Sequence, residues 1–327
     1  MMEGNGYSAA VYRLDSDFLE RMSVVRFSRA FFSHLHIWLI LAFLLLAGIS
    51  LFERSFFWYL YPFLIFFIAG RQGALLQILH EAVHGHLIRS SIFNELLGKW
   101  LAALPIGLSY EIYRKNHALH HAYTNTADPP EDSEKYRIVD FRNWRLYLLF
   151  LKDLSGISAI SGFLNSLIFS EKSKKRMPAT LQRFFQLAFV QGLILLIFFR
   201  FDLLTYFLFW IYPILGPHMF LMRVRGIAEH GLAKQLHVDV RSPSEGTFYT
   251  RSFLTKTKKY QFLPLVWLEK ALIGSLSVHY HHEHHLFPRI PFYNLKKLHE
   301  KVVLRAFELN PEIYASGYFS AVFRMVQ

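Results

Sequence analysis

The feature that most constrains this chain is a series of long segments without charged side chains. Residues 30–52 contain no Asp, Glu, Lys or Arg, and this run is long enough to span a bilayer. A second apolar run, residues 55–79, is interrupted by Arg71, whose side chain we expect to extend toward lipid headgroups. Two further runs, 184–199 and 203–222, are separated by a very short connection. The sequence therefore predicts an all-α integral membrane protein with four transmembrane helices in two hairpins.

Composition and charge distribution support this prediction. Hydrophobic residues make up 53% of the chain and charged residues 18%, against roughly 25% charged in soluble domains. Of 36 Lys and Arg residues, only Arg54 and Arg200 fall in the two predicted outer loops. Because basic residues gather on the cytosolic side of membranes, we expect both termini and the active site in the cytosol. A bacterial inner membrane is favoured and the endoplasmic reticulum is the alternative; the net charge of +12 then requires no nucleic-acid partner.

The whole chain, residues 1–327, is expected to form one domain, in which the membrane helices carry a helical cytosolic cap. The cap comprises residues 80–183 and 223–327. Within it, residues 92–109 are predicted to form an interfacial or half-buried helix. Residues 154–170 carry no charge before Glu171 but are predicted to be interfacial too. A fifth crossing there would place two related histidine motifs on opposite sides of the membrane.

Histidines recur in this chain at helical spacing. The motifs are His80-x-x-x-His84, His117-x-x-His120-His121 and His281-x-x-His284-His285. Residues three and four apart share a helix face, so each set is expected to point in one direction. The second and fourth apolar runs would also lead to His80 and to Glu229-His230, just beyond the headgroup level. We therefore expect the motifs to meet at the cytosolic ends of the spans.

Together these histidines form a candidate metal site. The nine candidate ligands are His80, His84, His117, His120, His121, His230, His281, His284 and His285. A structural zinc ion takes four ligands, so nine imidazoles suit two metal ions with open positions. Imidazole binds iron, copper, nickel or zinc, and the membrane setting favours redox iron acting on a lipid. Neutral imidazole ligands need acceptors for their second N–H, and Glu81, Glu229, Glu283 and Asp128 are the candidates, with solvated surface carboxylates as the alternative interpretation.

The motifs resemble the histidine boxes of the membrane fatty acid desaturase family, which includes related hydroxylases and ketolases. The resemblance rests on the segments His80-Glu81-Ala82-Val83-His84, His117-Ala118-Leu119-His120-His121 and His281-His282-Glu283-His284-His285, and on Arg225-Gly226-Ile227-Ala228-Glu229-His230-Gly231 between them. It spans roughly residues 35–300. It implies a helical membrane base and a cytosolic cap that holds a di-iron centre, with O₂ as co-substrate.

The resemblance implies an O₂-dependent desaturase that introduces a double bond into a fatty acyl chain of a lipid or an acyl thioester. The alternative is a hydroxylase or ketolase of an acyl chain, a sphingoid base or a carotenoid, using the same di-iron centre. The chain has no cysteine, which excludes iron–sulfur ligation within it. Electrons are therefore expected from a separate ferredoxin or haem cytochrome. His86, His279 and His282 lie beside the boxes, and each remains an alternative to an assigned ligand.

A different class of function is a metal transporter or a membrane haem protein. A transporter places polar ligands near the bilayer midplane, and a haem would need axial histidines within the spans. The residues available for a haem are His34, His36 and His218. The candidate ligands instead lie in or beside polar segments, which favours the enzyme.

Overall fold

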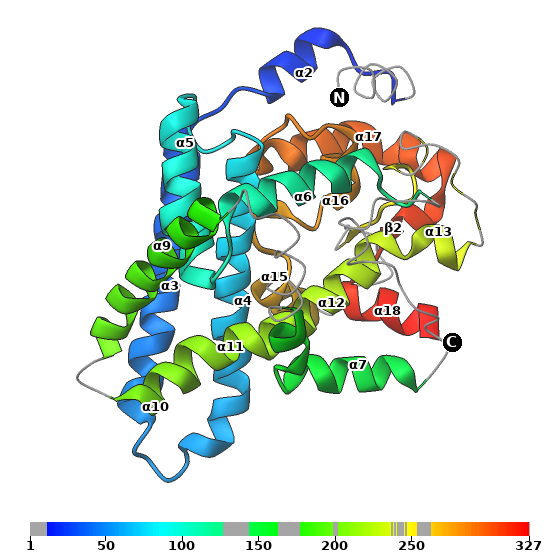
Figure 1. Cartoon of the computed structure of the whole chain (residues 1–327). Coiled ribbons are helices and arrows are strands. Elements are labelled where there is room, and N and C mark those ends of the chain that lie inside the picture. Colours follow the sequence, from blue (N-terminus) through cyan, green and yellow to red (C-terminus); the bar gives the residue numbers. More distant parts are fainter. Residues whose placement is uncertain are drawn as a thin grey trace.

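The computed structural model describes residues 12–126, 144–162, 177–198, 202–236, 247–253 and 263–326, together with residues 238, 240 and 245. These residues are mostly helical (Figure 1). Within the described residues, a parallel pair of two-residue strands departs from the predicted all-α class: β1 (Ser252–Phe253) and β2 (Tyr314–Ala315). Predicted features at Asp128, Arg200 and residues 163–170 lie outside the described residues.

Four helices of the described chain are long and apolar enough to cross a membrane, as predicted. They are α3 (Phe27–Leu51), α4 (Phe57–Val83), Leu181–Phe198 within α9 (Met177–Phe198), and the run Leu203–His230. The second and fourth extend further toward the histidines than the apolar runs alone predict. The crossing of a bilayer in two hairpins and the cytosolic placement of the cap remain predictions.

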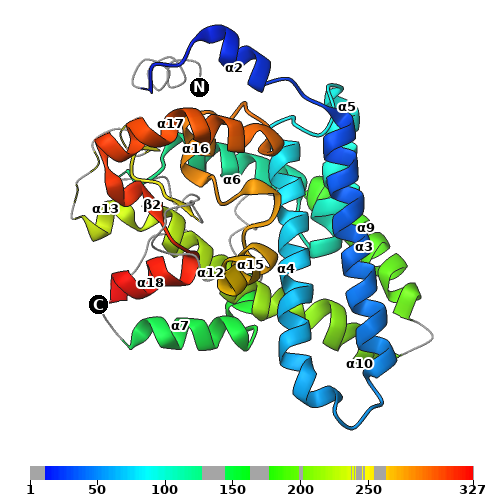
Figure 2. The same cartoon turned by 180° about the vertical axis from the view of Figure 1, so that it is seen from behind.

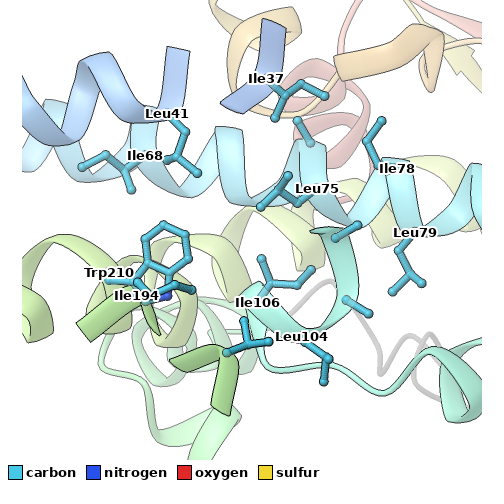
Figure 3. Packing of buried hydrophobic residues seen from close by; sticks show 14 of the residues in the cluster. Ile37, Leu41, Ile68, Leu75, Ile78, Leu79, Leu104, Ile106, Ile194 and Trp210 are labelled. Carbon is cyan, nitrogen blue, oxygen red and sulfur yellow. The ribbon is translucent and has the colours of Figure 1, made fainter. Parts of the chain in front are cut away.

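Helix α4 is the central element. In the apolar 18-residue stretch of α4, 61% of the residues are buried inside the protein, against 17% in the corresponding stretches of α3 and α9. Figure 3 shows the shared core, in which Leu41 of α3 lies beside Ile68 of α4 and Trp210 lies on the opposite side of α4. The approach at Gly48 is close, because a Cβ there would lie 2.5 Å from the Phe209 ring. This packing fixes the helix that carries the first histidines.

The fourth run is not a regular helix. It consists of α10 (Leu203–Tyr206), a π-helical turn η5 (Phe207–Ile211), α11 (Tyr212–Leu215) and α12 (Pro217–His230). The break falls at Gly216, with φ −108° and ψ −86°, immediately before Pro217. Proline has no N–H to continue the preceding helix, so Pro217 starts a new one. Beyond this break, α12 runs into the cap.

The cap is built from short helices around the ends of α4 and α12 (Figures 1 and 2). Its elements are α5 (Ser91–Gly98), η1 (Lys99–Ala103), η2 (Leu104–Ile106), α6 (Tyr110–Ala122), α7 (Arg145–Leu154), α13 (Leu232–Gln235), α15 (Leu263–Leu272), η6 (Ser275–Ser277), α16 (His281–Leu286), η7 (Phe292–Asn294), α17 (Leu295–Leu309), η8 (Pro311–Ile313) and α18 (Tyr318–Val326). A further short helix, α2 (Ser16–Met22), precedes α3. The predicted helix over residues 92–109 is divided among α5, η1 and η2, and its second half is largely buried.

One predicted orientation differs in the structure. Arg71 does not extend away from the protein; its guanidinium donates to the Ala271 carbonyl and to Ser275 Oγ, the latter at 3.0 Å. The side chain therefore joins α4 to the end of α15. This hydrogen bond is partly buried, and partial burial strengthens a charge-assisted hydrogen bond.

Candidate metal centre

The first two ligand candidates come from the end of α4. His80 lies in its last turn and His84 is its C-cap, so the two rings lie on one face with centroids 4.9 Å apart. Gly85 follows with φ +80°, a left-handed conformation that favours glycine. This turn brings the buried His86 back beside Glu81, whose carboxylate accepts from His86 Nδ1 at 2.8 Å.

Helix α6 supplies the second box. Ser109 caps its N-terminus by accepting from the Ile112 N–H, and Glu111 in the first turn binds Lys99 at 2.6 Å. Its final turns carry His117, His120 and His121. Two anchors at the start of α6 therefore set the direction of the histidines at its end.

The remaining candidates come from α12 and α16. His230 is the last residue of α12, and His281, His284 and His285 lie on α16, a helix of six residues. Such a short helix has little stability of its own and needs tertiary contacts to hold its orientation. All six of its residues are buried.

The structure brings all nine predicted candidates together, in two groups. The five-histidine group contains His80, His84, His117, His121 and His284, and the four-histidine group contains His120, His230, His281 and His285; within each group the potential ligand atoms lie within 4.8 Å of one another. The two groups are adjacent, since the ring centroids of His121 and His285 are 4.4 Å apart.

Each HxxHH box contributes to both groups, which the sequence alone did not predict. In α6, His117 and His121 enter one group and His120 enters the other. In α16, His281 and His285 share a group and His284 enters the other. Residues four apart point in nearly the same direction, whereas the intermediate residue is rotated enough to reach the neighbouring group.

The donor geometry fits metal binding. Within the first group the Nε2 atoms of His84 and His117 lie 2.9 Å apart, and those of His121 and His117 lie 3.0 Å apart. Two nitrogens bound to one ion lie at most about 4.2 Å apart when each metal–nitrogen bond is about 2.1 Å. The separations of 2.9 and 3.0 Å therefore allow these pairs of nitrogens to bind the same ion. In the second group, His285 Nε2 is buried without a hydrogen-bond partner. A metal ion would satisfy that atom.

The protonation state also suits ligands. Burial lowers the pKa of His117, His121, His281, His284 and His285, and neighbouring imidazoles lower each of them further. The cluster therefore favours neutral imidazole at pH 7, which is the form that binds metals.

Three predicted carboxylates lie around the groups, all buried. Glu81 accepts from His80 Nδ1 at 3.2 Å, and Glu229 lies 3.4 Å from His281 Nδ1 and binds Arg225 at 2.8 Å. These contacts fix which ring nitrogen faces the group. Glu283 acts differently, because it binds His299 Nδ1 at 2.6 Å and Tyr314 at 3.0 Å, neither of which is a ligand candidate.

The neighbouring histidines left open by the sequence lie outside both groups. His282 has both ring nitrogens in hydrogen bonds, with Tyr12 Oη at 2.9 Å and Thr250 Oγ1 at 3.1 Å. The Nδ1 atom of His279 lies 3.4 Å from the Gly274 carbonyl. His86 is held by Glu81, as described above. Neither His218 nor His34, considered for a haem, joins the groups.

The sequence did not indicate the role of the N-terminal segment. Tyr12 is buried against His282, and its ring stacks on Phe248. Further along, the Asn294 amide donates to the Met22 carbonyl at 2.6 Å. Residues 12–26 thus cross the elements around the third box (Figure 2). Tyr12 follows no recognisable motif, so only the folded structure reveals this contact.

Comparison with known proteins identifies the family. The sequence model of the fatty acid desaturase family matches residues 56–315, which include all nine histidines. The chain belongs to the fatty acid desaturase family. It is therefore an oxidoreductase. Its two histidine groups are clusters that could hold iron.

Individual relatives share less than a third of their residues with this chain. The desaturase is 28% identical over 255 residues to dihydrorhizobitoxine desaturase of Bradyrhizobium elkanii, covering 73% of this chain and 67% of that protein. It is 26% identical over 253 residues to the chloroplastic omega-6 fatty acid desaturase of Arabidopsis thaliana, covering 75% of this chain and 54% of the plant protein. The chain thus spans about two thirds of the first relative and about half of the second.

Proposed function

We propose that this chain is an O₂-dependent desaturase that introduces a double bond into a fatty acyl chain of a membrane lipid or an acyl thioester. The observation that carries the proposal is the pair of adjacent histidine groups at the ends of two apolar helices long enough to span a bilayer. An acyl chain in the bilayer can approach such a site without leaving an apolar environment.

The proposed cofactor is a pair of iron ions, one in each histidine group. His80, His84, His117, His121 and His284 would hold one ion, and His120, His230, His281 and His285 the other. Reduced iron, when bound, supplies the O₂ activation that oxidation of an unactivated methylene requires. All-imidazole donors do not select iron by themselves, so family membership is the further support.

The balanced reaction sets the requirement for a partner. Removing two hydrogens from adjacent methylenes while reducing O₂ to two waters consumes two electrons and two protons from outside. The chain has no cysteine to hold an iron–sulfur cluster. We therefore propose a separate ferredoxin or haem cytochrome as the donor, approaching from the cytosolic side.

The protein's own residues contribute position, charge and exclusion of water. Burial keeps the box histidines neutral, so that they are ready to act as ligands. Glu81 and Glu229 orient His80 and His281 through their outer nitrogens. All six residues of α16 are buried, so this helix helps to exclude solvent from the groups.

The substrate is proposed at the level of class. The relatives described above are named for dihydrorhizobitoxine and for omega-6 fatty acid desaturation, so similar chains serve different substrates. The fatty acyl assignment here rests on the family and on the apolar helices that lead to the site. All the named relatives are desaturases, which favours desaturation over hydroxylation.

Lipid analysis with isotopically labelled oxygen tests the proposal. The protein is expressed with a ferredoxin and its reductase under ¹⁸O₂, and new lipids are identified by mass spectrometry. A product two hydrogens lighter without ¹⁸O supports desaturation, whereas ¹⁸O in the product would assign a hydroxylase or ketolase. His36→Ala, which changes an exposed histidine of α3, is the matched control for changes in the groups.

A further inference from the structure

Helix α7 presents an apolar face that no part of the described chain covers. Trp144 at its N-cap is 64% exposed, and Tyr147, Leu148 and Leu151 are 55%, 41% and 61% exposed. These positions have the spacing i, i+3, i+4 and i+7, so they form one stripe along the helix. An exposed stripe of large apolar side chains marks an interaction surface.

The opposite face of α7 is firmly packed, so the exposure does not reflect a loosely attached helix. Asp153 is fully buried and accepts from Arg223 Nη2 of α12 at 2.8 Å. The Phe150 ring lies 5.1 Å from Phe220 of α12. A Cβ on Gly216 would lie 2.5 Å from the Leu154 carbonyl oxygen, so the helix end sits directly on the backbone break.

The depth of α7 follows from this ion pair. Arg223 is the first charged residue after the apolar run 203–222, so it marks the level at which that helix leaves the apolar layer. A second arginine, Arg71 of α4, binds the end of α15 in the same way, and α15 also exposes an aromatic residue, Trp267, at 64%. Each of the two helices with exposed tryptophans is thus joined by an arginine to one of the long apolar helices.

The polar margin of the stripe indicates which surface it contacts. Arg145 and Lys152 are exposed beside it, and the single carboxylate of α7, Asp153, faces inward. Trp, Tyr and Leu flanked by basic residues is the composition of helices that lie in a membrane interface. The charges suit anionic headgroups.

We infer that α7 lies in the interface of the bilayer that the four helices cross, with its apolar stripe among the acyl chains and Arg145 and Lys152 at anionic headgroups. The membrane surface is its partner, because α3 and α9 of the same chain also expose large apolar side chains. This inference rests on the four spans and not on the chemistry of the histidine groups. Through Asp153 and Arg223, α7 then connects the membrane surface to the helix that ends in His230.

Fluorophore labelling tests this placement, because the chain has no cysteine and a single introduced cysteine can be labelled without background. Leu148→Cys and Leu151→Cys report on the stripe. Phe43→Cys, 69% exposed on α3, reports on a span, and Leu304→Cys, 77% exposed on α17, is the matched control on the cap. Each full-length variant carries an environment-sensitive fluorophore in vesicles that contain lipids with a quencher near the headgroup or deep in the acyl chain.

The expected result is strong quenching of labels 148 and 151 by the shallow quencher, deep quenching of label 43, and little quenching of label 304. Quenching of labels 148 and 151 no stronger than that of label 304 would overturn the inference, and label self-quenching that rises with protein density would assign the stripe to a second copy instead. In vesicles with anionic lipid, the labels at 148 and 151 should shift their emission further to the blue. Arg145→Glu with Lys152→Glu should abolish that additional shift, and its persistence would contradict the proposed headgroup contact.

Discussion

Replacing Glu81 with Gln tests how far the surrounding carboxylates control the metal groups. One Glu81 oxygen accepts from His80 Nδ1 at 3.2 Å, and the other accepts from His86 Nδ1 at 2.8 Å and the Phe292 N–H at 3.1 Å. Glutamine has a single acceptor oxygen. The glutamine oxygen is expected to take the position that accepts two hydrogen bonds, from His86 Nδ1 and the Phe292 N–H. The amide NH₂ then points toward His80 Nδ1, which loses its acceptor. The lost hydrogen bond is therefore that of His80, a candidate ligand.

The magnitude follows from that lost bond. A buried donor without an acceptor costs about 1–3 kcal/mol, which corresponds to about 5- to 150-fold in a binding constant. Loss of a carboxylate that orients a ligand typically weakens metal binding about 10- to 100-fold. We expect iron binding in the five-histidine group of Glu81→Gln to weaken by about 10- to 100-fold. The four-histidine group should be nearly unchanged, because Glu81 contacts none of its members.

Anaerobic titration of the metal-free protein with Fe(II), against a competing chelator, measures the two affinities. The native protein should bind two iron ions, and Glu81→Gln should retain one at chelator concentrations that spare both in the native protein. Glu95→Gln is the control, since Glu95 is a partly exposed carboxylate 3.5 Å from Arg114 and belongs to neither histidine group. Native affinity at both sites in Glu81→Gln would refute the reasoning.

Three further predictions concern the same region. His284→Ala should abolish formation of the lipid product, while membrane insertion, measured by protease protection, stays native. Full activity of this variant would contradict the assignment of His284 as a metal ligand. The control variant His36→Ala should be active. Tyr12→Phe removes the hydroxyl group that hydrogen-bonds to His282 and should lower the free energy of unfolding by about 1 kcal/mol. The variant should also lose iron to a chelator faster than the native protein. An unchanged rate of iron release would show that this contact does not hold the third box in place. The pKa of Glu111 falls to about 2, because hydrogen bonds from Lys99 and Ser109 outweigh the burial that would raise it, so the carboxylate stabilises the fold above its unfolded pKa of about 4.5. Glu111→Gln should therefore lower the melting temperature at pH 7, and this difference should shrink below about pH 4.5; a difference independent of pH would contradict the role of the charge.

That the candidate ligands of each box share a helix face could be predicted from the sequence, because helical spacing is a local property. His80 and His84 share a face wherever a helix forms, and so do His117 and His121. The division into two groups was not readable, since the assignment of His120 depends on the approach of α12 and α16 from distant parts of the chain. Spacing alone does not state which partner a rotated side chain will meet.

The same distinction applies to the fold. Charge-free runs located the four long helices, because apolar length is a direct requirement of the bilayer. The position of Arg71 was misjudged because the sequence shows its charge but not the Ala271 carbonyl that receives it. The irregular turn at residues 207–211 and the contact of Tyr12 with His282 likewise depend on tertiary packing.

The third box contacts residues that lie far from it in the sequence, and this has a consequence for the order of events during synthesis and metal loading. Tyr12 and His282 are 270 residues apart, and neither histidine group is complete before His284 and His285 have been synthesised. All four long helices precede these residues and would enter the membrane first. The nascent chain therefore carries partial sets of imidazoles until its last section emerges. Loading of metal into this protein should follow translation, and a chain truncated before residue 281 should insert normally yet acquire no stable metal pair.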